Sequence, residues 1–287
     1  IILVDMESQR NLLIETDQLA ELIESNPDNL KLVCGTWNKD PDAVDAKEQF
    51  NEAHIEGSVY FSHAEIADPS AEFRSTWPST EFFISEMKRL GIKKNHTIVL
   101  YDHENIFSVC RPSYMLRSFG AKDVRVLNGC LKKWISEGRK VTTGYPQDIN
   151  DTSDEGYDYE LDQDACTCYD STFEKVAAAE KGETDQYEFV DVRDSKRFRE
   201  GHPHGFKNQC YQCLLTEDNS AFKSKEEISK QMEEDGVDTR KHIVFSCGSG
   251  VTACISELAA EVVGVEKTSV YDGSYTEYSK RGKPDFL

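Results

Sequence analysis

The feature that most constrains the fold of this chain is an internal repeat. Residues 91–102 resemble residues 236–247, at a shift of 145 residues (236 − 91). Two further matches have nearly the same shift and keep the same order along the chain. Residues 50–57 match residues 198–205, and residues 126–129 match residues 270–273. Random similarity does not preserve order and spacing together. The sequence therefore predicts two copies of one domain.

The length of the chain agrees with a duplication. A chain of 287 residues is longer than one average hydrophobic core serves. Residues 144–164 are rich in Asp, Thr and Ser, contain Gly and Pro, and have few apolar residues, which is typical of a linker. We therefore expect a first domain over residues 1–143, a linker over 144–164 and a second domain over 165–287.

Each half alternates short apolar runs with helical patterns. The runs at 30–33, 97–101, 124–127, 188–192, 242–246 and 269–271 predict buried strands, and the spacing at 81–90, 111–119, 226–234 and 251–263 predicts helices. Strands that alternate with helices favour a mainly parallel sheet with helices on both faces. The predicted fold class is therefore α/β, with one such sheet in each domain.

Composition excludes several classes of partner. The formal net charge of −20 argues against binding nucleic acid or an anionic membrane, because both need clustered Lys and Arg. No apolar run reaches the roughly 18 to 20 residues that a membrane helix needs. Nine cysteines are an odd number in a chain too large to need disulfides. We expect a reduced intracellular protein, cytoplasmic or alternatively mitochondrial, and a monomer or weak dimer.

The most informative segment is 242–253. A predicted strand ends just before Cys247, a loop with Gly248 and Gly250 follows, and a helix is predicted to begin near Val251. Ligands of parallel sheets bind beyond the carboxyl ends of strands. Backbone N–H groups of such a loop form an anion-binding nest, and the helix N-terminus adds to it. This setting favours a thiolate nucleophile at Cys247. We expect the glycines to keep side chains away from these N–H groups.

The cysteines allow two other interpretations. A cysteine phosphatase needs an arginine six residues after its nucleophile, and that position is Ala253, so this class is excluded. Most free cysteines are small buried hydrophobic residues, and this interpretation is kept for the other eight. In the first half, Asp102 occupies the position of Cys247, so this half lacks the nucleophile.

The loop and its flanking motifs resemble the 3-mercaptopyruvate sulfurtransferases, a family of tandem rhodanese-like domains whose first domain is inactive. The segments that carry the resemblance are 247–253, 191–193, 197–198, 271–277, 111–120 and 127–134. The resemblance implies that Cys247 is the nucleophile and Ser249 a second catalytic residue. It also implies that Arg197 binds the substrate carboxylate. The remaining substrate-binding positions implied are Gly248, Gly250, Val251 and Thr252.

The charge of the loop bears on the substrate. Gly248 and Ser249 stand where thiosulfate sulfurtransferases are expected to carry basic residues, so a substrate with one carboxylate, such as 3-mercaptopyruvate, fits better than a dianion. The resemblance implies a thiol acceptor such as thioredoxin, or cyanide, with no cofactor and no metal. Two alternatives stay open, namely thiosulfate as the sulfur donor, and a weakly active or inactive chain that serves as a protein-binding module.

Three places depart from the family pattern. The loop after Arg197 is short and offers only Arg199 as a second arginine. Ser75 and Ala64 stand where the family places the His and Asp of a relay with the loop serine. His63 and Arg74 lie close by in sequence and are the candidates to substitute for them. The usual His-Ile-Pro-Gly turn of the family is replaced by His-Pro-His-Gly at residues 202–205.

Four further residues of the second half have expected roles of their own. We expect His202 to hydrogen-bond the backbone, and Arg193 to be structural, paired with Asp191 or a neighbouring carboxylate. Cys210 and Cys213 have the spacing of a redox pair or half a zinc site, a weak signal without a second pair.

Overall fold

The computed structural model describes residues 11–25, 28–38, 44–73 and 76–287. The first half forms a five-stranded sheet in the order β1-β5-β4-β2-β3, and every pair of neighbours is parallel. Its strands are β1 (Leu13–Ile14), β2 (Leu30–Cys34), β3 (Val59–Tyr60), β4 (Thr97–Tyr101) and β5 (Asp123–Leu127).

The second half repeats this arrangement. Its sheet has the order β6-β10-β9-β7-β8, again with parallel neighbours. Its strands are β6 (Cys166–Thr167), β7 (Tyr187–Asp191), β8 (Lys207–Asn208), β9 (His242–Ser246) and β10 (Thr268–Tyr271). Strand for strand the two orders are the same, so the predicted duplication and the α/β class with two parallel sheets are confirmed.

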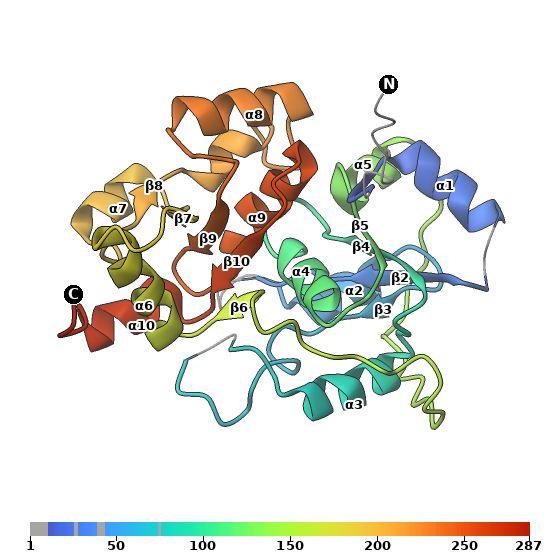
Figure 1. Ribbon diagram of the computed structural model, residues 1–287. Coiled ribbons are helices and arrows are strands. Elements are labelled where there is room, and N and C mark those ends of the chain that lie inside the picture. The colour runs from blue at the N-terminus through green and yellow to red at the C-terminus, as the bar shows by residue number, and fades with distance from the viewer. Residues whose placement is uncertain (1–10, 26–27, 39–43, 74–75) are drawn as a thin grey trace, which may run out of the picture.

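Helices connect the strands and flank both sheets (Figure 1). The helices of the first half are α1 (Thr16–Ser25), α2 (Ala46–Glu52), α3 (Thr80–Leu90), α4 (Cys110–Ser118) and α5 (Cys130–Ser136). Those of the second half are α6 (Tyr169–Glu180), α7 (Ser195–Glu200), the 3-10 helix η1 (Tyr211–Leu214), α8 (Lys225–Glu234), α9 (Ala253–Val263) and α10 (Ser274–Arg281).

The predicted elements agree with the observed ones within one or two residues. One difference matters for the site, because α9 begins at Ala253 and not near Val251. Val251 and Thr252 therefore belong to the loop, and the loop has two more N–H groups outside the helix than the sequence suggested.

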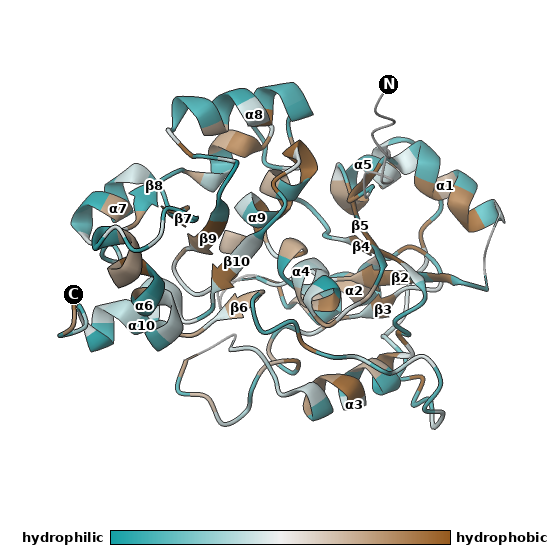
Figure 2. Ribbon diagram, in the orientation of Figure 1, coloured by the Kyte–Doolittle hydropathy of each residue, from teal (hydrophilic) through white to brown (hydrophobic). Residues whose placement is uncertain are grey.

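A shared core joins the two halves. Side chains alternate along the buried strands, as a sheet covered on both faces requires. Ile243 and Phe245 face a central cluster that also contains Leu116 of α4 and Leu258 of α9, whereas Val244 faces a separate outer cluster. In Figure 1, α4 and α9 lie between the two sheets. Apolar residues gather on the strands, and hydrophilic residues cover much of the outer helices (Figure 2).

One repeated motif serves the same structural purpose in both halves. His54 Nδ1 lies 2.8 Å from the carbonyl oxygen of Phe50, and the two rings stack at 4.0 Å. His202 Nδ1 lies 2.9 Å from the carbonyl oxygen of Phe198, with the rings at 3.8 Å. Each histidine ties the end of a helix to the following turn. The expectation that His202 hydrogen-bonds the backbone is confirmed.

Residues 144–164 contain no helix and no strand, but they pack against the first half. Tyr157 and Tyr159 are buried, and the Tyr159 hydroxyl donates to the carbonyl of Ile92 at 3.0 Å. Among the helices of the described residues, none has the length and apolar character that crossing a membrane requires.

Candidate active site

Cys247 directly follows β9 and lies at the carboxyl edge of the second sheet. The residue is 1% exposed, and its N–H donates to the Ser274 hydroxyl at the start of α10 at 3.1 Å. Residues 248–252 form a loop between Cys247 and α9. This is the strand, loop and helix arrangement that the sequence predicted around the nucleophile.

Three carbonyl groups at and after Cys247 are held by hydrogen bonds from α10 and from the first domain. The Cys247 carbonyl accepts from the N–H of Tyr275 at 3.0 Å, and the Gly248 carbonyl accepts from the N–H of Thr276 at 2.9 Å. The Gly250 carbonyl accepts from Arg111 Nη1 at 3.0 Å. Each peptide is planar and trans, so the N–H that follows each of these carbonyls points the opposite way.

The N–H groups of the loop are available to an anion. Among the described parts of the chain, the backbone N–H groups of residues 248–252 donate to no other residue. Gly250 and Val251 are buried, whereas the other three residues are partly exposed. Buried N–H groups are normally paired, so this row of amides beside a thiol is suited to a sulfur anion. We interpret this loop as the expected nest.

The two glycines of the loop differ in what they contribute. Gly250 has φ of +76°, and a Cβ there would lie 2.7 Å from the carbonyl oxygen of Asp272. Glycine is therefore required at this position. A Cβ on Gly248 would meet no atom within 4 Å, so close contacts do not require glycine there, and the expected role of Gly248 in keeping side chains away from the N–H groups stays a prediction.

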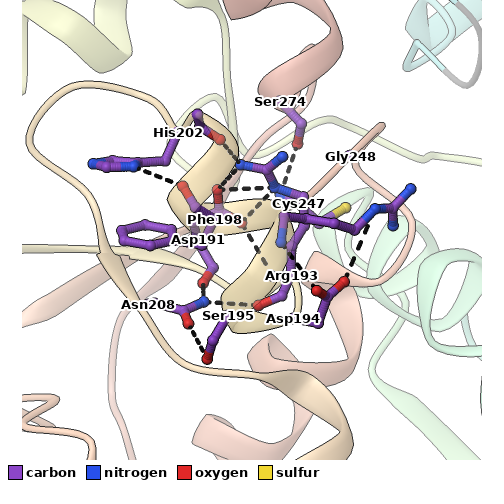
Figure 3. A network of polar contacts seen from close by, with 12 residues as sticks. Asp191, Arg193, Asp194, Ser195, Phe198, His202, Asn208, Cys247, Gly248 and Ser274 are labelled. Carbon is purple, nitrogen blue, oxygen red and sulfur yellow. Dashed lines mark hydrogen bonds and ion pairs between the residues drawn. The ribbon is translucent and has the colours of Figure 1, made fainter.

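A buried ion pair lies at the end of β7, between Asp191 and Arg193 (Figure 3). Asp191, the last residue of β7, accepts from Arg193 Nη2 at 2.6 Å and from Arg193 Nε at 3.0 Å. The same guanidinium donates to the carbonyl of Gly201 and lies over the ring of Tyr275, 3.9 Å from its centroid. Arg193 thus joins β7, α7 and α10, which confirms the expected pairing with Asp191.

Two adjoining cavities open onto the loop. The larger has a volume of about 600 Å³ and the smaller about 260 Å³, and Gly248, Ser249 and Arg197 line both. Cys247, Val251 and Thr252 line the smaller one. The structure therefore brings the predicted nucleophile, the loop serine and the predicted substrate arginine to one place.

The first domain forms the opposite wall, which the sequence did not reveal. Trp37 lies in the loop after β2 and lines both cavities, and Phe107 lies in the loop after β4 and lines the smaller one. Their rings stack with centroids 6.2 Å apart. The carboxyl edges of the two sheets thus face each other across the site. The spacing of aromatic residues in the sequence gave no signal for this contact.

Arg197 is placed by the first turn of α7. Its backbone N–H donates to the Asp194 carboxylate at 3.0 Å, a helix N-cap, and its Nε lies 3.9 Å from the same carboxylate. The side chain is 56% exposed. Arg199 is exposed and lines neither cavity. Lys280 of α10 lines the larger cavity and pairs with Glu72 at 3.3 Å, a cation that the sequence analysis missed.

The structure gives no support for His63 as a substitute relay residue. His63 Nε2 donates to the carbonyl of Gly35 at 3.0 Å, and its ring stacks on Trp37. Burial, together with the nearby Arg111 cation, lowers the pKa of His63 to about 3, so the ring is neutral. Ala64 is exposed. Ser75 and Arg74 lie outside the described residues.

In the first domain, the carboxyl group of Asp102 lies at the position that corresponds to Cys247. Asp102 accepts from the N–H of His103 at 2.8 Å, and its other oxygen accepts from the N–H of Ser108 at 3.2 Å and the Ser108 hydroxyl at 2.8 Å. Asp102 follows β4 as Cys247 follows β9. The first domain therefore holds a buried carboxyl group, fixed by hydrogen bonds, at the position that corresponds to Cys247, and burial raises the pKa of this group.

The other cysteines are less uniformly buried than expected. All nine are free thiols, and Cys34, Cys110, Cys130 and Cys254 are buried, whereas Cys166, Cys210 and Cys213 are partly exposed and Cys168 is exposed. The expectation of burial is therefore wrong for these last four. Within the described residues, no three His, Cys, Asp or Glu side chains cluster as metal ligands would.

A buried cysteine in a loop at the carboxyl edge of a duplicated parallel sheet defines a class of protein, and comparison with known families gives this class a name. Residues 15–137 and 174–281 each match the Rhodanese-like domain. The chain belongs to the rhodanese family.

Relatives with curated names are sulfurtransferases. The chain is 31% identical to thiosulfate sulfurtransferase of Gallus gallus over 90% of this chain and 89% of that protein. It is 29% identical to 3-mercaptopyruvate sulfurtransferase of Homo sapiens over 89% and 87%. These relatives support the class of sulfurtransferase. The two substrate names occur at nearly equal identity, so the substrate has to be argued from the site.

Solved structures agree on the fold. A crystal structure of SseA from Escherichia coli, described as a 3-mercaptopyruvate sulfotransferase, superposes with a TM-score of 0.81 at 24% identity over 92% of this chain and 98% of that chain. The sulfur transferase subunit of yeast mitochondrial complex I gives a TM-score of 0.79 at 27% identity, covering 96% and 98%.

Proposed function

We propose that this protein transfers sulfane sulfur from 3-mercaptopyruvate to a thiol acceptor or cyanide through a persulfide on Cys247. The observation that carries the proposal is the row of loop N–H groups around the thiol, which have no acceptor among the described residues and lie at the wall of a cavity that Arg197 also lines.

The proposed reaction has two halves. The Cys247 thiolate attacks the sulfur of 3-mercaptopyruvate, the carbon–sulfur bond breaks, and its electrons leave with pyruvate enolate, which takes up a proton to give pyruvate. The outer sulfur then remains on Cys247 as a persulfide. The N–H groups of residues 248–252 stabilise the sulfur anion, as an oxyanion hole stabilises oxygen. A thiol such as that of thioredoxin then takes the outer sulfur and restores Cys247.

Ser249 is the second proposed catalytic residue. It is half-buried and lines both cavities next to Cys247. Its hydroxyl donates to no other described residue, so it is available to polarise the substrate carbonyl or pass a proton to the enolate.

The charges of the cavity walls favour a substrate with a single negative charge. Arg193 is neutralised by Asp191, and Lys280 pairs with Glu72. Arg197 has only the distant Asp194 contact, so it is the described lining cation with the weakest pairing. One such cation suits one carboxylate better than the dianion thiosulfate. Thiosulfate is the second candidate donor, since the chicken relative has that name.

Arg197→Ala is expected to lower kcat/KM for 3-mercaptopyruvate about tenfold, because it removes a charge-assisted contact that is partly screened by water at a half-exposed side chain. The loss is expected mainly in KM, as for an interaction equal in ground and transition states. Arg199→Ala is the matched control, on the same helix but away from both cavities, and is expected to stay within about twofold. Equal effects of the two variants would remove Arg197 from the substrate site.

The substrate is tested by charging the loop. Gly248→Arg with Ser249→Lys is expected to raise the ratio of kcat/KM for thiosulfate over 3-mercaptopyruvate by about tenfold or more, because two cations favour a dianion. The space at Gly248 accepts a side chain. Gly248→Gln with Ser249→Gln is the neutral control of similar size. If the ratio in wild type already favours thiosulfate, the proposed donor is wrong. If neither donor turns over, the protein-binding alternative stands.

A further inference from the structure

An arginine of the first domain reaches behind the catalytic loop of the second. Arg111, in the first turn of α4, is 3% exposed. Its Nη1 donates to the Gly250 carbonyl at 3.0 Å, and its Nη2 pairs with the Asp272 carboxylate at 3.1 Å. The guanidinium therefore holds a loop carbonyl and a carboxylate at once, in the planar fork geometry that only arginine provides.

The contact fixes the direction of one amide of the nest. Because the peptide between Gly250 and Val251 is planar and trans, a carbonyl held toward Arg111 keeps the Val251 N–H on the opposite side, where the nest lies. The second domain itself holds the carbonyls of Cys247 and Gly248 through α10. The Gly250 carbonyl has one other described partner, the Cys254 thiol, at the longer distance of 3.4 Å.

Asp272 makes the arrangement a bridge between the domains. It follows β10, and its second carboxylate oxygen accepts from the backbone N–H of Trp77 in the first domain at 2.9 Å. The indole of Trp77 in turn lies 6.0 Å from the Arg111 guanidinium. Trp77 and Asp272 thus fix the position of Arg111 from both sides, and the loop is pressed against it, since a Cβ on Gly250 would lie 2.9 Å from Arg111 Nη1.

We propose that Arg111 is a positioning residue for Cys247. By holding the Gly250 carbonyl, Arg111 keeps the Val251 N–H directed at the sulfur and so stabilises the thiolate and the persulfide anion. The domain that lacks a nucleophile thereby supplies part of the active site of the other. This inference rests on the proposed role of Cys247 as the nucleophile.

The matched control lies on the same helix. Arg117 of α4 is also buried, with 6% of its side chain exposed, and it crosses the same domain interface to Glu257 at 2.7 Å and Glu261 at 2.6 Å on α9. Among the described residues, Arg117 makes no hydrogen bond or ion pair with the loop. A variant of Arg117 therefore loosens the interface without releasing the Gly250 carbonyl.

The test measures the rate of alkylation of Cys247 by iodoacetamide against pH, followed on the Cys247 peptide by mass spectrometry. Arg111→Met is expected to move the pH midpoint upward by about one unit, because one amide of the nest is lost. Its kcat is expected to fall about tenfold with KM within about twofold. Arg111→Lys is expected to recover part of the shift. Arg117→Met is expected to lower Tm but leave the midpoint unchanged.

The other charged or titratable groups near the sulfur are the same in all variants, so the difference reports on Arg111; they are Arg193, Asp194, Arg197, Tyr211 and Cys254. Equal shifts in the Arg111 and Arg117 variants would show general loosening and overturn the proposal, as would an unchanged midpoint in folded Arg111→Lys and Arg111→Met. If Arg111→Met does not fold, Arg111→Lys and Asp272→Asn decide by the same midpoint. The midpoint is independent of the sulfur donor, so failure of the proposed function, seen as no persulfide in wild type, is a separate result.

Discussion

Cys247→Ser is expected to abolish sulfur transfer, with a loss of about a thousandfold or more in kcat, while the chain remains folded. The hydroxyl of serine is far less acidic than a thiol and cannot hold the transferred sulfur as a persulfide. Serine is also close to cysteine in size, so the 1% exposed site keeps its packing. Steady-state turnover and thermal unfolding of the same preparation measure the two effects.

Cys110→Ser is the control for this substitution. Cys110 is a fully buried thiol of α4 and is not among the residues that line the site cavities. Its replacement is expected to keep turnover within about threefold of wild type. Substantial turnover in Cys247→Ser, above about 1% of wild type, would place the nucleophile elsewhere.

Arg193→Met is expected to lower the free energy of unfolding by about 3–5 kcal/mol, because it leaves the Asp191 carboxylate buried and unpaired. The side chains are 6% and 0% exposed, so water cannot replace the lost partner. The contacts with Gly201 and Tyr275 are lost as well. Urea unfolding followed by circular dichroism measures the change.

The chain contains a matched exposed pair. Arg240 contacts Asp238 with two hydrogen bonds of 2.9 Å at the same spacing of two residues, but its side chain is 88% exposed. Arg240→Met is expected to change the free energy of unfolding by less than about 0.5 kcal/mol. If the two variants lose similar stability, burial is not what makes the Arg193 pair important.

The central strands of both sheets were predicted well, because they are continuous apolar runs. The internal repeat also allowed the runs of one half to be compared with those of the other. The run at 242–246 was placed correctly, and so was its copy at 97–101. The edge strands β1, β3, β6 and β8 have two residues each and were not predicted, since so short a segment has no periodicity to detect. The helix α7 has six residues and none of them is buried, so it has no apolar stripe either.

The candidate site was predicted only as far as local sequence specifies it. The sequence indicated Cys247 and its loop because strand, glycines and helix follow one another along the chain. Arg111 lies 139 residues before Gly250, and Trp37 is further still, so their contacts depend on how α4 packs against α9. The difference between Gly248 and Gly250 was not predicted, because the atoms that a Cβ on Gly250 would meet belong to Asp272 and Arg111, far away in the sequence.

The central claim is that Cys247 carries the transferred sulfur. Wild-type protein is mixed with 3-mercaptopyruvate without an acceptor, the free thiols are blocked, and the peptides are mapped by mass spectrometry. The account predicts the added mass of one sulfur atom on the peptide that contains Cys247, together with one pyruvate per chain, and neither in Cys247→Ser. Added sulfur on Cys210 or Cys213 instead, or pyruvate released with Cys247 unmodified, would contradict it.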